Sequence, residues 1–153
     1  MHKRSRRGIC DQARRTFFAC ATVIAVATTA AGQDAAQDYP QWRGKSGEGA
    51  ASAFIAPSAW PDSLTRRWRI DVGEGYATPL VIGDTVYIFA RRDGNEVISS
   101  FDVSTGVERW RPAYPLRYTP SGPTVAHGSG PKATPLFHEG RLFTLGISGV
   151  LSA

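Results

Sequence analysis

The chain has 153 residues, enough for one modest domain, with 18 Lys and Arg against 13 Asp and Glu and a formal net charge of +5 at pH 7. Six of the basic residues and one acidic residue lie in the first 32 positions, so residues 33–153 are neutral, with 12 residues of each sign, and a nucleic-acid partner is not expected. Both cysteines, Cys10 and Cys20, also lie in this first part, which excludes disulfides, thiolate metal sites and cysteine nucleophiles from residues 33–153.

The N-terminal residues have the pattern of a secretory signal peptide. A basic segment, residues 1–15, precedes an uncharged apolar run, residues 16–32, which ends in small residues. We predict a signal peptide over residues 1–32 and export to the periplasm or out of the cell, with the mature chain starting near residue 33. Because the apolar run is short and rich in Ala and Thr, we expect no membrane span in the mature chain.

The export route stays open between two alternatives. Arg14-Arg15 followed by Phe17-Phe18 is similar to the twin-arginine signal. Ala13 stands where that signal usually has Ser or Thr, and no Lys follows the two phenylalanines. A general secretory (Sec) signal with a chance arginine pair is the alternative.

Residues 33–63 are rich in Ala, Gly, Ser and Pro and show neither helical nor strand periodicity. We predict an extended N-terminal arm here. Trp42 and Trp60 are expected to anchor the arm on its own domain, since large aromatic side chains gain most from burial. Binding of a partner by these tryptophans is the alternative.

From Leu64 onward the sequence predicts strands. Residues 64–72 alternate apolar and polar side chains towards their end, as a half-buried strand does. Gly83-Asp84 separates two β-rich runs and indicates a hairpin. No segment has the apolar spacing of a long helix. An antiparallel meander of four strands is therefore expected after the first strand, over residues 77–82, 85–90, 96–102 and 107–111.

The same order of residues then starts again. At an offset of 56, Ala77-Thr78-Pro79-Leu80 matches Ala133-Thr134-Pro135-Leu136. With a turn that is three residues shorter, residues 97–100 match residues 150–153. Four-stranded units at such a period are typical of a β-propeller. The Pro-rich stretch 112–131 is expected to be a loop that lengthens the repeat.

These observations predict an all-β chain. The expected architecture is the start of a β-propeller over residues 64–153, namely a first strand and about one and a half four-stranded antiparallel blades. Since the second copy stops inside a predicted strand, we expect the chain to be the N-terminal fragment of a longer protein, truncated within the second blade.

A turn motif follows the third predicted strand of the first copy. Asp102 and Thr105 are placed to accept hydrogen bonds from backbone amides across a tight turn, and Gly106 suits a positive φ. Trp110 is expected to project as a flat plate against the neighbouring blade. We expect these four residues to be structural.

The pattern Asp102-x-x-Thr105-Gly106-x-x-x-Trp110 resembles the tryptophan-docking repeat of the pyrrolo-quinoline quinone (PQQ)-like β-propeller family. Leu64 and Trp68 look like the first strand of that family, which completes the last blade and closes the ring. Residues 40–44 and 127–135 are similar to segments of bacterial exported members. The resemblance covers about residues 38–153.

The resemblance implies one of two functions. In the first, the propeller is a binding scaffold without a cofactor, like the lipoprotein of the outer-membrane β-barrel assembly machinery, which presents its loops to partners. In the second, the chain is the N-terminal part of a quinoprotein dehydrogenase that holds PQQ and calcium and oxidises alcohols or sugars. Such enzymes use a vicinal disulfide and Asn, Asp and Glu oxygens, whereas residues 33–153 lack cysteine and contain only Asn95 as asparagine. We therefore favour the scaffold and assign no catalytic, cofactor-binding or metal-binding residue.

One loop carries the candidate ligand residues. His127 and Lys132 lie in a Gly- and Pro-rich stretch, with Arg117 upstream. Loops between blade strands reach the face of a propeller, where a protein or a small ligand would bind. His127 is a candidate acid-base or metal-binding residue. The alternative is a loop histidine that bonds only to backbone.

Overall fold

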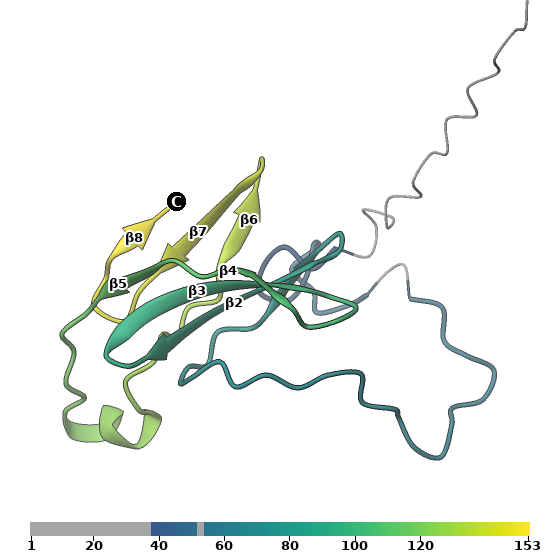
Figure 1. Cartoon of the computed structure of the whole chain (residues 1–153), viewed down its shortest axis with the longest axis horizontal. Coiled ribbons are helices and arrows are strands. Elements are labelled where there is room, and N and C mark those ends of the chain that lie inside the picture. The colour runs from purple at the N-terminus through teal and green to yellow at the C-terminus, as the bar shows by residue number, and fades with distance from the viewer. Residues whose placement is uncertain (1–37, 52–53) are drawn as a thin grey trace, which may run out of the picture.

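The computed structural model describes residues 38–51 and 54–153. The predicted signal peptide, residues 1–32, lies outside the described residues, as does the start of the predicted arm. The described part of the chain is built from antiparallel strands in two sheets, and its one helical element is the short 3₁₀-helix η2, Gly122–His127 (Figure 1). The all-β prediction is thus confirmed at this level. No helix among the described residues is long and apolar enough to cross a membrane.

The first sheet is a meander in the order β1-β2-β3-β4. Its first hairpin turns at Gly83, which has φ 55°. Its second turns at Asp93 and Gly94, with φ 51° and 79°, as a tight two-residue hairpin turn requires. The predicted hairpins are therefore confirmed, with these strand bounds: β1 Leu80–Ile82, β2 Thr85–Arg92, β3 Asn95–Asp102 and β4 Glu108–Trp110.

The outer strand of this sheet is longer than the sequence predicts. A further strand, β5 Ala113–Pro115, also pairs with β3. Trp110 lies opposite Ser100, and Ala113 lies opposite Val97, so the end of β4 and β5 keep one register, whereas the register shifts at Ser100/Phe101 within the β3–β4 pair. Between them the Ile98 amide donates to the Pro112 carbonyl at 3.1 Å. A proline on an outer strand lacks a donor but still accepts, so the prediction of a loop over 112–131 is wrong for its first residues.

The second sheet repeats the first in its register. It consists of β6 Leu136–His138, β7 Arg141–Leu145 and β8 Leu151–Ser152. Leu136 pairs with Phe143 as Leu80 pairs with Tyr87, 56 positions earlier. Leu145 pairs with Leu151 as Phe89 pairs with Ile98. The structure therefore has the same strand pairing that the sequence alignment predicts, including the shorter turn before β8.

The two sheets meet through different faces of the repeat. The first sheet contributes Tyr87, Ile98 and Trp110 to the space between the sheets, and the second contributes Phe137 and Leu142. The repeat equivalent of Leu142 is Val86, the neighbour of Tyr87 in β2. Successive side chains of a strand point to opposite faces. The second sheet therefore contacts the first with the face that carries Leu142, and the corresponding face of the first sheet, which carries Val86, points away from the junction. Figure 1 shows the second sheet, in yellow, standing at an angle to the first.

The repeated Ala-Thr-Pro-Leu segments lie side by side at this junction. The backbone amide of Thr78 donates to the Oγ1 of Thr134 at 3.0 Å. These residues hold the same position in the two copies, and the two sheets pack with opposite faces, so the second unit follows the first head to tail.

The N-terminal arm is attached by backbone hydrogen bonds rather than by its tryptophans. Tyr39 exchanges two backbone hydrogen bonds with Val81 of β1, at 2.7 and 3.1 Å. The carbonyl of the next residue, Pro40, accepts from the amide of Phe137 in β6 at 2.8 Å. The arm thus joins both sheets. Trp42 and Trp60 remain 65% and 63% exposed, so their prediction as anchors is wrong in the structure.

The predicted first strand, Leu64–Val72, does not form. Pairing starts only beyond it, where Glu74 and Arg91 exchange backbone hydrogen bonds at 2.9 and 2.7 Å. A strand needs a neighbour for its backbone donors and acceptors, and in the described part of the chain none lies beside this segment. The segment is attached to the first sheet through the side chain of Trp68, whose Nε1 donates to the Val103 carbonyl at 2.9 Å.

Candidate functional site

The Asp-Thr-Gly turn between β3 and β4 is closed by one carboxylate. Asp102 Oδ1 accepts from the amide and hydroxyl of Ser104 at 3.0 and 2.7 Å. The same oxygen accepts from the amide and hydroxyl of Thr105, both at 2.9 Å. Gly106 follows with φ 72°. The two amide contacts of Asp102 were predicted from the motif, as was the acceptor role of the Thr105 hydroxyl, which lies 3.3 Å from the Val107 amide; the two hydroxyl donors to Asp102 were not predicted.

A guanidinium joins this turn to the first hairpin. Arg109 Nη2 lies 2.7 Å from Asp84 Oδ2 and 2.8 Å from Asp102 Oδ2. The hydrogen bond from Arg109 lowers the pKa of Asp84 from 3.8 to about 2. Hydrogen bonds from Ser104 and then from Arg109 hold the pKa of Asp102 well below its usual range. Two carboxylates therefore lie close together here, and the positive charge that they bind is the Arg109 side chain.

This pair does not fit the calcium that the family resemblance implies. Calcium takes six to eight oxygen ligands, whereas Arg109 already binds both oxygens of Asp84 and one oxygen of Asp102. Within residues 38–51 and 54–153, no three His, Cys, Asp or Glu side chains come together as a metal site.

The tryptophan that packs on the turn is Trp68, not Trp110. A Cβ placed on Gly106 would lie 2.7 Å from the Trp68 ring, so the ring lies directly on the glycine. Trp110 stays 43% exposed. Its ring contacts Tyr87 at 5.8 Å between centroids, and Tyr87 in turn stacks on Phe137 of the second sheet at 5.8 Å. Trp110 thus reaches the second sheet only through Tyr87, and its packing against a neighbouring blade stays a prediction.

The predicted ligand loop brings two of its three candidates together. The Lys132 ammonium lies 4.3 Å from the centre of the Tyr76 ring and donates to the His127 carbonyl. The His127 ring meets the edge of Tyr76 at 6.2 Å between centroids. Arg117 is exposed, and within residues 38–51 and 54–153 no hydrogen bond or ion pair joins it to His127 or Lys132.

This loop is seated firmly on the start of the first unit. The Tyr76 amide donates to the Pro131 carbonyl at 2.9 Å, and the Ser129 hydroxyl donates to a Glu74 carboxylate oxygen at 3.2 Å. A Cβ on Gly130 would overlap the backbone of Glu74. The side chain of His127 is exposed at the end of η2. A ligand can therefore reach it without opening the loop.

A groove between the two sheets is a feature that the sequence analysis missed. It has a volume of about 500 Å³ and mostly apolar walls. Tyr87, Trp110 and Phe137 form its aromatic part, and Arg141 lies on its lining. This volume is in the range of small-ligand sites. Tyr87 in β2 and Trp110 in β4 both lie opposite Ser100 of β3, so their side chains point to the same face of the first sheet and form the aromatic wall together.

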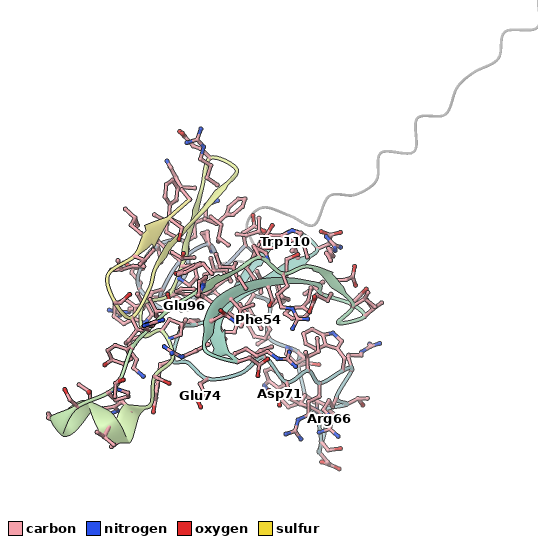
Figure 2. All side chains as sticks on the ribbon, turned by 60° about the vertical axis from the view of Figure 1, so that its left-hand side comes forward. Phe54, Arg66, Asp71, Glu74, Glu96 and Trp110 are labelled. Carbon is pink, nitrogen blue, oxygen red and sulfur yellow. The ribbon has the colours of Figure 1, made fainter. Side chains whose placement is uncertain are left out.

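A buried carboxylate lies beside this groove. Glu96 is fully buried at 0% exposed, and Figure 2 shows it where the two sheets meet. It accepts from the Tyr114 hydroxyl at 2.6 Å and from the Ile147 amide at 2.6 Å. Burial, and then the hydrogen bond to Glu96, raises the pKa of Tyr114 to about 12. In the sequence, Glu96 follows a hairpin turn and gives no sign of this burial.

Comparison of the chain with protein-family models, with curated proteins and with solved structures gives no match.

Proposed function

We propose that the chain is an exported binding module built from PQQ-like propeller blades, which presents the His127 loop to a protein or a small ligand. The observation that supports it most is the head-to-tail packing of two sheets with one register, in which Thr78 contacts its repeat equivalent Thr134. An arrangement of this kind can be continued by further units, and a ring of such units is a propeller.

The chemistry of the described side chains supports binding rather than catalysis. The carboxylates of Asp84 and Asp102 are held by Arg109, and that of Glu96 by Tyr114 and Ile147. Glu96 is buried, and the exposed Asp84 has both of its oxygens bound by Arg109. In contrast, the imidazole of His127 is exposed next to a segment that the Ser129–Glu74 hydrogen bond holds in place, and the exposed guanidinium of Arg117 lies upstream in the sequence.

A photo-crosslinking experiment tests the proposal. A photoreactive amino acid is introduced at Arg117 or at His127 in the full-length protein and irradiated in the producing cell. The control position is Glu139, an exposed residue in the β6–β7 turn. We expect discrete crosslinked products from the two loop positions and none from the control. Equal labelling of all three positions, or none, would contradict a binding role for the loop.

The dehydrogenase alternative is tested on the same preparation. The full-length protein is mixed with PQQ and calcium and then separated from free quinone. The binding module is expected to carry no quinone absorbance and to oxidise no alcohol or sugar. Bound quinone together with oxidation of either substrate would favour the enzyme.

A further inference from the structure

The buried carboxylate of Glu96 connects elements of both sheets. Glu96 belongs to β3 and Tyr114 to β5 of the first sheet, whereas Ile147 lies in the turn between β7 and β8 of the second. The two donors approach different oxygens: the Tyr114 hydroxyl lies 2.6 Å from Oε2, and the Ile147 amide lies 2.6 Å from Oε1. One side chain thus holds three segments that are distant in the sequence.

Among the described residues, no ion pair with Glu96 explains why a carboxylate is buried here. Arg91 is the cross-strand partner of Glu96 and shares its face of the sheet. Its guanidinium instead donates to the carbonyls of Leu116 and Ser129, at 3.0 and 3.4 Å. Burying a carboxylate is costly unless hydrogen bonds replace its water. The two neutral donors are therefore what makes the position tolerable, and one of them comes from the second sheet.

The second sheet is shaped to receive this side chain. Gly146, next to Ile147, is buried, and a Cβ placed on it would overlap Glu96 Oε2 and lie 3.0 Å from the Tyr114 hydroxyl. Only a residue without a side chain leaves room for the carboxylate. Nearby, the hydroxyls of Thr144 and Ser152 lie 3.2 Å apart across β7 and β8.

We propose that Glu96 is an inter-sheet latch, which holds the β7–β8 turn against β3 and thereby fixes the width of the groove between the sheets. Tyr114 and Ser152 line that groove, so the latch and the groove share a wall. The latch is independent of the proposed binding function, because it concerns how two units are held together and not what the loop binds.

Hydrogen exchange of the Ile147 amide tests the latch in the full-length protein. Glu96→Ala removes the acceptor, and we expect exchange at Ile147 to become on the order of tenfold faster, while amides of the β2–β3 pair keep their rates. Glu108→Ala is the matched control, since Glu108 is an exposed glutamate on β4. An unchanged rate at Ile147 would overturn the latch, as would an equal rise throughout β2 and β3.

Gly146→Ala tests the same contact from the other side and leaves Glu96 in place. Alone it should also accelerate exchange at Ile147, because the added methyl group displaces the carboxylate. Combined with Glu96→Ala it should add little, because the methyl group then occupies the space of the missing carboxylate. Independent, multiplicative effects of the two substitutions would overturn the contact. Glu96→Gln, which keeps the volume, should accelerate exchange less than Glu96→Ala.

Discussion

At the scale of single residues, Gly106 carries two constraints at once. Its φ of 72° lies in the left-handed region, which costs other residues on the order of 1 kcal/mol or more. Its missing side chain also leaves room for the Trp68 ring, which a Cβ would approach to 2.7 Å. The backbone constraint was predictable from the sequence. The contact was not, because it depends on where a segment 38 positions earlier lies.

Gly106→Ala is therefore expected to destabilise the protein more than the same change at a glycine with only a backbone constraint. Gly140 is that control, with φ 76° and nothing within 4 Å of a Cβ. We expect Gly140→Ala to cost about 1 kcal/mol and Gly106→Ala about 1–3 kcal/mol more, from overpacking against Trp68. Urea unfolding of both variants measures the difference. Equal losses would mean that Trp68 does not rest on the turn.

The Asp84–Arg109–Asp102 cluster predicts a dependence of stability on pH. A carboxylate whose pKa is lower in the folded than in the unfolded chain stabilises above the unfolded pKa, and this stabilisation is lost as the pH falls through the folded pKa. For Asp84 these values are 3.8 and about 2, and the pKa of Asp102 is also lowered. The temperature of the unfolding midpoint should therefore decrease as the pH is lowered from about 4 to about 2.

The measurement compares thermal midpoints from pH 5 to pH 2 in the protein and in two asparagine variants. Asp102→Asn should flatten the fall, because it removes a group whose pKa differs between the two states. Asp93→Asn is the control, since the side chain of Asp93 is 89% exposed in its turn. A fall of the same steepness in Asp102→Asn and in the unmodified protein would contradict the assignment.

At the scale of elements, the sequence predicts strands well where both partners are local. The turn residues Gly83 and Gly94 mark the two hairpins of the first sheet, and their strands form with bounds within three residues of those predicted. The outer strand continues past its predicted end at residue 111, because the pairing with β3 goes on beyond Pro112, where the sequence pattern indicates a loop. Residues 64–72 alternate correctly and still form no strand, since alternation does not supply a partner.

The arm shows the same limit. Its composition predicts an extended segment. Its large tryptophans suggest that they attach the arm to the sheets, but both are exposed. The segment is held instead by backbone hydrogen bonds of Tyr39 and Pro40 to the edge strands β1 and β6. Backbone pairing at the edge of a sheet depends on register and position, and neither is encoded in residue type.

Tyr39→Pro tests this attachment, because proline cannot donate the backbone hydrogen bond that Tyr39 gives to the Val81 carbonyl at 2.7 Å. We expect the amides of Val81 and Phe137 to exchange on the order of tenfold faster. Trp42→Ala should leave both rates unchanged, since Trp42 is exposed. Faster exchange in Trp42→Ala alone would restore the tryptophan as the anchor.

At the scale of the whole molecule, the repeat contains more information than any single motif. The offset of 56 predicts that β6 and β7 copy β1 and β2, and the structure has that register. How the two copies pack was not predictable, because the choice of face depends on contacts between Tyr87 and Phe137 across the junction. The groove and the latch at Glu96 arise from that choice, which is why the sequence gives no sign of either.

The head-to-tail packing of the two units is tested most directly by a pair of cysteines at equivalent positions. Thr78→Cys and Thr134→Cys are introduced together into the chain from residue 33 onward, where no native cysteine competes. The amide of Thr78 lies 3.0 Å from the side-chain oxygen of Thr134, so the two sulfurs should come within reach of a disulfide. The control pairs Thr78→Cys with Thr144→Cys, a buried position of β7. Peptide mapping without reductant should find the 78–134 link and not the 78–144 link. No link between 78 and 134, or equal yields for the two pairs, would contradict the junction of the two repeated segments on which the head-to-tail packing depends.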